Sequence, residues 1–271
     1  MKTKIAIISV YFGRFPKYFE CFKRTAFYNS NYDWFIFTDQ VREIKKENNI
    51  FFIPYSLSLF NKKLSTIFNI PINIKEPNRI GDTKPIYAKI FELFVGNYDW
   101  WGWTDIDLLN GNFNKFLNDD IFNEYDVISA LNTTVHPGRT SLNGPFTLLS
   151  MKHKDLYKGI QNYGDMLASG NPGGRHNAFI VEEKEFYDLI VEKKLKLYTG
   201  KTINGHLVSI IRYGKRKLPA SWIDGDIEIQ SYKEDYWPTY VDTYGCNTII
   251  YHLPKKFDQL KLYDNGIIEI I

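Results

Sequence analysis

The sequence has few cysteines, little net charge and no long apolar run. Its 271 residues include only Cys21 and Cys246, which are too few for a disulfide framework and indicate a reducing compartment. The formal net charge is +3, whereas a nucleic-acid-binding domain needs a concentrated basic face, so we expect no nucleic-acid partner. No apolar run reaches the roughly 20 residues of a membrane-spanning helix. No G-x-x-x-x-G-K-[ST] motif occurs, which argues against a Walker-type NTPase.

Residues 1–16 begin like a signal peptide but lack its other features. Their apolar run is short, no small-residue cleavage site follows it, and Arg14 and Pro16 interrupt the segment. We therefore expect a buried first strand in a cytoplasmic protein. The basic clusters at residues 193–196 and 215–217 are typical of solvated faces. The alternative is weak attraction to anionic lipids, which would give at most a peripheral association with the inner face of the cell membrane.

Apolar runs of strand length alternate with segments of helical periodicity along the chain. The continuous apolar runs are typical of strands buried in a mostly parallel sheet. We therefore predict an α/β fold with a mixed, mostly parallel sheet flanked by helices, formed by residues 1–271 as a single domain. The patterns predict strands at residues 4–12, 33–39, 49–56, 98–105, 125–131 and 144–151, and helices at 16–29, 83–97, 154–163 and 182–194.

Three other regions are less regular. Residues 57–80 hold a helix around 64–68 and then a proline-broken loop. Residues 169–177 are rich in glycine and proline and are predicted to form a mobile loop. The C-terminal third contains short strands at residues 227–232, 247–253 and 266–271.

The segment YDWWGWTDIDLLNGN, residues 98–112, places two acids after a strand with three tryptophans. In an extended segment residues two apart point the same way, so Asp105 and Asp107 can face one ligand together. Ligands of open α/β sheets bind at the carboxyl ends of the strands, and oxygen-only ligands suit Mg²⁺ or Mn²⁺. A lone Asp-x-Asp is a weak signal, however, and two solvated turn residues are the alternative.

The motifs DTKPIYAKIFE and YDWWGWTDIDLLNGN, with NTIIYHLPKK near the end, resemble those of a known family. They are similar to the D-x-K-P, W-G-x-x-D-x-D and closing His motifs of bacterial polysaccharide glycosyltransferases with the Rossmann-like GT-A fold. The resemblance extends from the first strand to about Lys256. It implies hexosyl transfer from a nucleotide sugar, UDP before GDP, with Mn²⁺ or Mg²⁺ at Asp105 and Asp107. The implied acceptor is a growing capsule or O-antigen chain, or another lipid-linked saccharide.

The same resemblance implies donor-binding roles for residues near the predicted strands 4–12, 33–39 and 98–105. Tyr11 or Phe12, followed by Gly13, would lie under the nucleotide base, and Asp39 would hold the base or ribose. The alternatives are an aromatic residue packed on the next helix and a turn or cap residue, respectively. Further donor contacts are expected from Lys84, Asp105 and Lys255, and from Asp82 unless it only caps a helix.

Glu182 and Glu183 are the candidate catalytic residues. An inverting transfer needs a carboxylate that removes the proton of the acceptor hydroxyl, and we predict Glu183 in this role, or otherwise Glu182. The alternative is the usual enrichment of acids at a helix N-terminus. His252 is predicted as a third metal ligand because it ends an apolar strand before Lys255 and Lys256. A hydrogen-bonded His at a sheet edge is its alternative.

Two other functions compete with glycosyl transfer. A nucleotidyltransferase also binds nucleotide and Mg²⁺ on an α/β sheet, but VYFGRFPK, residues 10–17, is too poor in glycine for its phosphate loop. A non-catalytic carbohydrate-binding protein is suggested only by the aromatic content of 17%. A general bias towards Asn, Ile, Lys, Tyr and Phe explains that content more simply, and a binding protein would not need Lys84 grouped with Asp105 and Asp107.

Overall fold

A computed structural model describes residues 2–75, 77–132, 140–169 and 181–199, together with the short strands 220–223, 226–229, 250–252, 260–262 and 268–270. The chain divides into two compact units that alternate along the sequence. Unit 1 comprises Met1–Phe15, Asn31–Asp105 and Asp119–Tyr198, and unit 2 comprises Pro16–Ser30, Ile106–Asn118 and Thr199–Ile271. The single domain over residues 1–271 stays a prediction.

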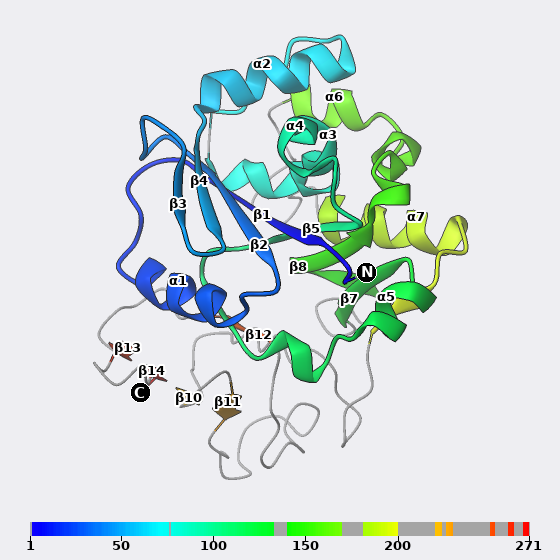
Figure 1. Cartoon of the computed structure of the whole chain (residues 1–271). Coiled ribbons are helices and arrows are strands. Elements are labelled where there is room, and N and C mark those ends of the chain that lie inside the picture. The colour runs from blue at the N-terminus through cyan, green and yellow to red at the C-terminus, as the bar shows by residue number, and fades with distance from the viewer. Residues whose placement is uncertain are drawn as a thin grey trace, which may run out of the picture. The chain divides into compact units, whose positions relative to one another are not determined.

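Unit 1 is built on an eight-stranded mixed sheet, and Figure 1 labels its strands β1 to β5, β7 and β8. Strands β4, β2, β1 and β5 are adjacent and parallel, whereas β3, β8 and β7 add antiparallel pairings. This confirms the predicted mixed, mostly parallel sheet. The order is β3 (Lys45–Glu47), β4 (Ile50–Pro54), β2 (Asp33–Thr38), β1 (Ile5–Tyr11), β5 (Trp100–Thr104), β8 (Ser141–Ser150), β7 (Val127–Asn132) and β9 (Leu197–Tyr198).

Helices flank both faces of this sheet, as predicted. Successive strand residues point to opposite faces, and β5 has buried aromatic side chains on both faces, each of which packs against a helix. Trp101 and Trp103 belong to the same buried cluster as Phe60 of α2 (Leu57–Phe68) and Phe91. Trp100 has its ring 5.1 Å from that of Phe122 in α5 (Asp119–Glu124). The aromatic strand 98–105 is therefore a buried central strand with packed side chains on both sides.

The predicted helix at residues 83–97 is wrong as one continuous helix. A 3₁₀ segment, η1 (Pro77–Ile86), contains Pro85 and is followed by α3 (Tyr87–Ile90) and α4 (Glu92–Val95). Pro85 has no amide hydrogen for an α-helical bond, and Phe91 departs from helical geometry with φ −106° and ψ 25°. Asp82 and Thr83 consequently lie inside η1 instead of capping an α-helix.

The other helix predictions shift in position. The region 57–80 holds a full helix, α2, which Ser56 caps by accepting a hydrogen bond from the amide of Leu59 at 3.1 Å. The helix predicted at 154–163 is wrong: that stretch forms 3₁₀ turns, and α6 (Tyr163–Ala168) follows it. The predicted helix 182–194 begins as a π-helical turn, η5 (Val181–Glu185), and continues as α7 (Phe186–Glu192).

Unit 2 contains α1 (Phe19–Tyr28) and two small sheets. The side-chain hydroxyl of Thr25 accepts a hydrogen bond from the amide of Asn110 at 3.1 Å, and Asn29 binds both Gly111 and Phe113. One sheet pairs β12 (Ile250–His252) with β6 (Leu108–Asn110) in antiparallel register. The other has the order β11 (Asp226–Ile229), β10 (Ala220–Ile223), β14 (Ile268–Ile270) and β13 (Leu260–Leu262).

The helices were compared with the length and apolarity that a bilayer-spanning helix needs. Among the residues that the structure describes, none of them is both long and apolar enough to span a bilayer.

Candidate active site

The carboxyl ends of four parallel strands lie along one edge of the unit 1 sheet. Strands β1, β2 and β5 end at Tyr11, Thr38 and Thr104. The polar residues that follow them include Asp39 and Asp105, which the sequence analysis singled out. The parallel register therefore brings residues far apart in the chain to the edge where α/β sheets bind ligands.

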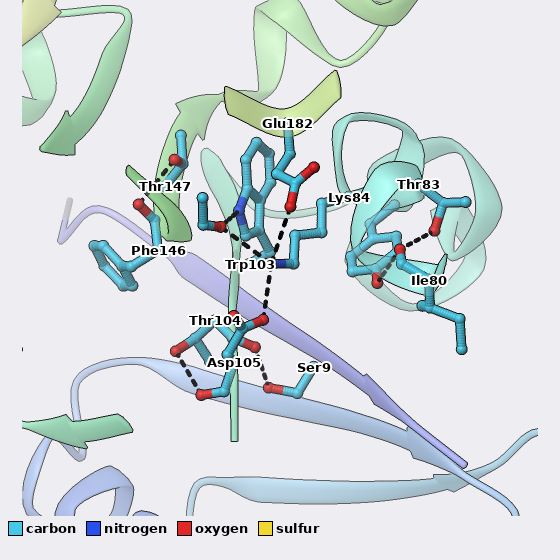
Figure 2. A network of polar contacts seen from close by, with 12 residues as sticks. Ser9, Ile80, Thr83, Lys84, Trp103, Thr104, Asp105, Phe146, Thr147 and Glu182 are labelled. Carbon is cyan, nitrogen blue, oxygen red and sulfur yellow. Dashed lines mark hydrogen bonds and ion pairs between the residues drawn. The ribbon is translucent and has the colours of Figure 1, made fainter. Parts of the chain in front are cut away.

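Lys84 is the centre of a buried polar cluster at the end of β5 (Figure 2). Its ammonium nitrogen lies 2.8 Å from Asp105 Oδ1 and 3.8 Å from Glu182 Oε1. It also donates a hydrogen bond of 3.1 Å to the carbonyl of Gly144. The Lys84 side chain is only 8% exposed, so it supplies a buried positive charge that compensates two carboxylates. We call Lys84, Asp105, Glu182 and Gly144 the Lys84 cluster.

Two members of this arrangement were not predicted from the sequence. The carbonyl of Gly144 accepts a second hydrogen bond, of 2.9 Å, from Trp103 Nε1. A Cβ atom at Gly144 would lie 2.8 Å from Glu183 Oε1, so only glycine fits between the strand and the acidic pair. A buried tryptophan needs a partner for its N–H, which was a usable signal for Trp103. Nothing local marks the carbonyl of Gly144.

Glu182 belongs to the Lys84 cluster through its 3.8 Å approach to the lysine. Burial raises the pKa of Glu182 to about 7, although the positive charge of Lys84 opposes this change. Its second oxygen, Oε2, is buried and has no hydrogen-bond partner among the described residues. Glu183 is also buried, 5% exposed, and lies next to Gly144. Glu182 therefore combines proximity to Lys84 with a pKa that burial raises to about 7.

Asp82 lies close by but points elsewhere. It is 7% exposed, and its Oδ2 lies 3.3 Å from Arg79 Nε. Burial raises the pKa of Asp82 to about 6, and the charge of Arg79 and a hydrogen bond from the Val181 amide act in the opposite direction. Asp82, a residue of η1, thus packs against the start of η5 within unit 1.

The loop after β1 is held by the residue that follows β2. The amide of Gly13, with φ +94°, donates a 2.9 Å hydrogen bond to Asp39 Oδ1. Phe12 is buried, and its ring lies edge-on to that of Phe60 with 6.0 Å between the ring centroids. Tyr11 is partly exposed and stacks on Phe15 with 5.5 Å between the ring centroids. Of the two rings, Tyr11 is the one that a ligand can reach. Asp39 thus holds the loop after β1 through one carboxylate oxygen, and its predicted contact with the base or ribose stays a prediction.

The acid motif itself forms a turn. Strand β5 ends at Thr104, and residues 106 and 107 form a turn before β6. The extended geometry assumed for Asp105 and Asp107 is therefore wrong. The Asp105 side chain is 34% exposed and already has a cation, the Lys84 ammonium, at 2.8 Å. A partly exposed carboxylate that accepts a positive charge fits the oxygen chemistry of Mg²⁺ or Mn²⁺.

The remaining predicted metal and phosphate ligands lie in unit 2. Asp107 directly precedes β6, and His252 pairs with Leu108 through the β6–β12 register. The backbone of His252 therefore lies opposite the residue after Asp107. Lys255, the side chain of His252 and most of the loop 169–177 lie outside the described residues. Within the described part of the chain, no three His, Cys, Asp or Glu residues are grouped so that they could hold a metal.

Comparisons with known proteins give one family match and several distant structural likenesses. Residues 7–161 match the model of a family of unknown function (DUF6625), which is more than half of the chain. No curated protein matches the sequence.

Several solved glycosyltransferases are similar to this chain. The galactosyltransferase LgtC, solved with donor and acceptor sugar analogs, is 11% identical over 72% of this chain and 71% of its own, with a TM-score of 0.38. GlyE of Streptococcus pneumoniae TIGR4 is 12% identical over 72% of this chain and 45% of its own, with a TM-score of 0.38. The catalytic domain of Drosophila β1,4-galactosyltransferase 7, in complex with xylobiose, is 16% identical over 74% and 66%, with a TM-score of 0.38. Likenesses this distant leave the reaction of this chain to be argued from its own residues.

Proposed function

This chain belongs to the DUF6625 family of unknown function, and from its own residues we propose that it is a metal-dependent glycosyltransferase. In this proposal it moves a hexosyl group from a nucleotide sugar, UDP before GDP, to a saccharide acceptor. The acceptor is a growing cell-surface polysaccharide, of capsule or O-antigen type, or a lipid-linked oligosaccharide. The observation that carries the proposal is the Lys84 cluster, which gathers the D-x-K-P lysine, the first acid of the Asp-x-Asp motif and Glu182 at the carboxyl end of β5.

The charges of the cluster suit a donor that carries a diphosphate. Asp105 and Asp107 would hold Mn²⁺ or Mg²⁺, with His252 as a third ligand, and the bound ion would offset negative charge on the departing nucleotide. Lys84 reaches Asp105 at 2.8 Å, so its ammonium group lies beside the predicted metal position and can pair with a phosphate oxygen. Lys255 has the same predicted role. A site for neutral sugar alone would not need a buried lysine next to the acid motif.

Glu182 is the better candidate for the general base of an inverting transfer. A general base works best when its pKa is near the operating pH, and burial raises the pKa of Glu182 to about 7. Its carboxylate also lies 3.8 Å from Lys84, which places it within the cluster. Glu183 remains the second candidate. Replacement of the true base by Gln is expected to reduce the rate by roughly 10²–10⁴ while donor binding persists.

Other parts of the proposal rest on the sequence. Tyr11 is expected to stack on the nucleotide base, and Asp39 to contact the base or ribose through its second oxygen while it holds Gly13. The loop 169–177 is proposed to close over the bound substrates. The protein is proposed to work in the cytoplasm, with at most a peripheral attachment to the membrane that carries the acceptor.

A donor screen tests the proposal directly. Release of free UDP or GDP from a panel of sugar nucleotides is measured with and without Mn²⁺, for the unmodified protein and for Asp105→Asn. We expect release from at least one donor that depends on Mn²⁺ and falls by 10²-fold or more, an effect typical of lost electrostatic stabilisation, in Asp105→Asn.

The matched control is Asp155→Asn, which removes a surface carboxylate that pairs with Lys158 at 3.0 Å. Its activity is expected to equal that of the unmodified protein. Mn²⁺-dependent UDP binding, measured by calorimetry, should likewise be lost in Asp107→Ala. No release from any donor, or full activity in Asp105→Asn, would contradict the proposal.

A further inference from the structure

The carboxylate of Asp82 faces the backbone of the segment that carries the acidic pair. It accepts a hydrogen bond from the amide of Val181 and is paired with Arg79 at 3.3 Å. Val181 is fully buried and is the first residue of η5, immediately before Glu182. A contact at Val181 therefore sets the position from which the Glu182 side chain starts.

The residue before Asp82 meets the other end of the Glu182 side chain. A Cβ atom built on Gly81 would lie 3.2 Å from Glu182 Oε1, so the absence of a side chain leaves room for that oxygen. Oε1 is also the oxygen that lies 3.8 Å from Lys84. Asp82 thus contacts the backbone just before Glu182, and Gly81 leaves the space that the Glu182 carboxylate occupies.

Asp82 is itself held firmly on its own segment. Its backbone carbonyl accepts a 2.7 Å hydrogen bond from the hydroxyl of Tyr163, at the start of α6. The charge of Arg79 compensates the buried carboxylate. Asp82 is therefore fixed through its backbone carbonyl by Tyr163 and through its carboxylate by Arg79. A residue that positions another must itself be held in place.

We propose that Asp82 and Gly81 form a seat that positions Glu182 against Lys84, and that Asp82 is a positioning residue and not a donor ligand. The aspartate of the D-x-K-P motif then positions Glu182, the proposed general base. The lysine two residues later pairs with the phosphate of the donor. The catalytic part of this inference rests on the proposed function, but the structural part does not.

The test compares Asp82→Ala with Asp82→Asn. Hydrogen exchange of the Val181 amide is followed by NMR, which requires no substrate. Because Ala removes the acceptor, we expect exchange at Val181 to accelerate by roughly 10–100-fold, as for the loss of a hydrogen bond to a charged group. Asn keeps an acceptor oxygen in the same place and should restore most of the protection.

Kinetics then separate positioning from donor binding. With an active donor, Asp82→Ala should lower kcat by roughly 10²-fold, the effect of a misplacement of about 1 Å, with donor KM unchanged. Asp82→Asn should recover most of the rate. A raised donor KM with normal kcat would make Asp82 a donor ligand. Unchanged exchange of the Val181 amide in folded Asp82→Ala would contradict the positioning role of Asp82. If no donor is turned over, the proposed function fails while the exchange data still decide the seat.

Gly81→Ala provides the second variant in case Asp82→Ala does not fold. Its Cβ would lie 3.2 Å from Glu182 Oε1, so the carboxylate must shift by a few tenths of an ångström while the Asp82–Val181 hydrogen bond persists. We expect lower kcat, unchanged donor KM and unchanged Val181 exchange. Wild-type kcat in this variant would overturn the role of Gly81.

Discussion

Lys84 is a buried cation whose contribution to stability depends on the carboxylates of Asp105 and Glu182 beside it. Its side chain is 8% exposed, and those of Glu182 and Asp105 are 13% and 34% exposed. Removal of one partner of a buried ion pair costs several kcal/mol, because the other charge stays buried without compensation. Lys84 therefore contributes to folding as well as to the proposed chemistry, and the two contributions can be measured separately.

We expect Lys84→Met to lower the free energy of unfolding by about 1–3 kcal/mol at pH 8, a value below the full buried-pair cost because Asp105 is partly exposed. The loss should shrink at pH 5, since Glu182 without Lys84 binds a proton more readily and its charge disappears. Denaturant unfolding at both pH values measures this. Lys158→Met, which removes the surface partner of Asp155, is the control and should change stability by less than about 0.5 kcal/mol. An equal loss at both pH values would contradict the argument.

The pairing of β5 with β8 depends on the glycine between two buried tryptophans. Gly102 lies opposite Leu148 in the antiparallel register. A Cβ atom at Gly102 would lie 2.1 Å from the carbonyl oxygen of Thr147 and 2.8 Å from Leu148 Cα. These are backbone atoms that cannot rotate away, so the strand can approach β8 only with glycine at this position. The same pairing brings Gly144 and Pro145 to the end of β5.

Gly102→Ala is therefore expected to destabilise the protein by about 3 kcal/mol or more, because it forces β5 and β8 apart. Gly13→Ala is the matched comparison. Its Cβ would meet no atom within 4 Å, but its φ of +94° strains an L-residue, which costs roughly 1–2 kcal/mol. Thermal unfolding of the two variants measures the difference. If Gly13→Ala proves the more destabilised of the two, the close approach of β5 to β8 is not the limiting feature.

The pH dependence of folding combines carboxylates that act in opposite directions. Burial raises the pKa of Glu182 from 4.5 to about 7 and that of Asp82 from 3.8 to about 6. Between the unfolded and folded pKa of each group, the folded state binds more protons than the unfolded state. The two groups therefore reduce the free energy of unfolding as the pH rises through that range. Hydrogen bonds from Lys154 and Lys89 lower the pKa of Glu92 from 4.5 to about 2. Its contribution is present above pH 4.5 and is lost as the pH falls towards 2.

In Glu182→Gln, the free energy of unfolding is expected to fall less steeply as the pH rises. Relative to the unmodified protein, the variant should gain on the order of 1–3 kcal/mol between pH 4.5 and pH 8, because Gln cannot ionise. Urea unfolding at pH 4.5, 6 and 8 provides the measurement. Glu92→Gln is the opposite control, since its relative stability should decline as the pH rises from 2 to 5. A Glu182→Gln curve parallel to that of the unmodified protein would show that Glu182 does not titrate in this range.

Much of the fold was predictable because buried strands are encoded locally. The apolar runs at residues 4–12, 33–39 and 49–56 became β1, β2 and β4, and the aromatic run became β5. Parallel strands in adjacent positions place their carboxyl ends together, so residues after those strands could be chosen as candidates from the sequence. Asp39 after β2 and Asp105 after β5 were chosen in this way, whereas Lys84 came from the D-x-K-P motif and Glu182 from the acidic pair at residues 182–183.

The sequence by itself determined the buried strands, the acids that follow them and the types of charge available to a site. Only the tertiary structure decided that Glu182 lies 3.8 Å from Lys84, that Gly144 supplies a carbonyl, and that Asp82 contacts Val181. The physical reason is range. Strand and helix patterns depend on neighbours a few residues away, whereas these contacts join residues 60 to about 100 positions apart, whose meeting depends on sheet register and on backbone atoms that carry no sequence signal.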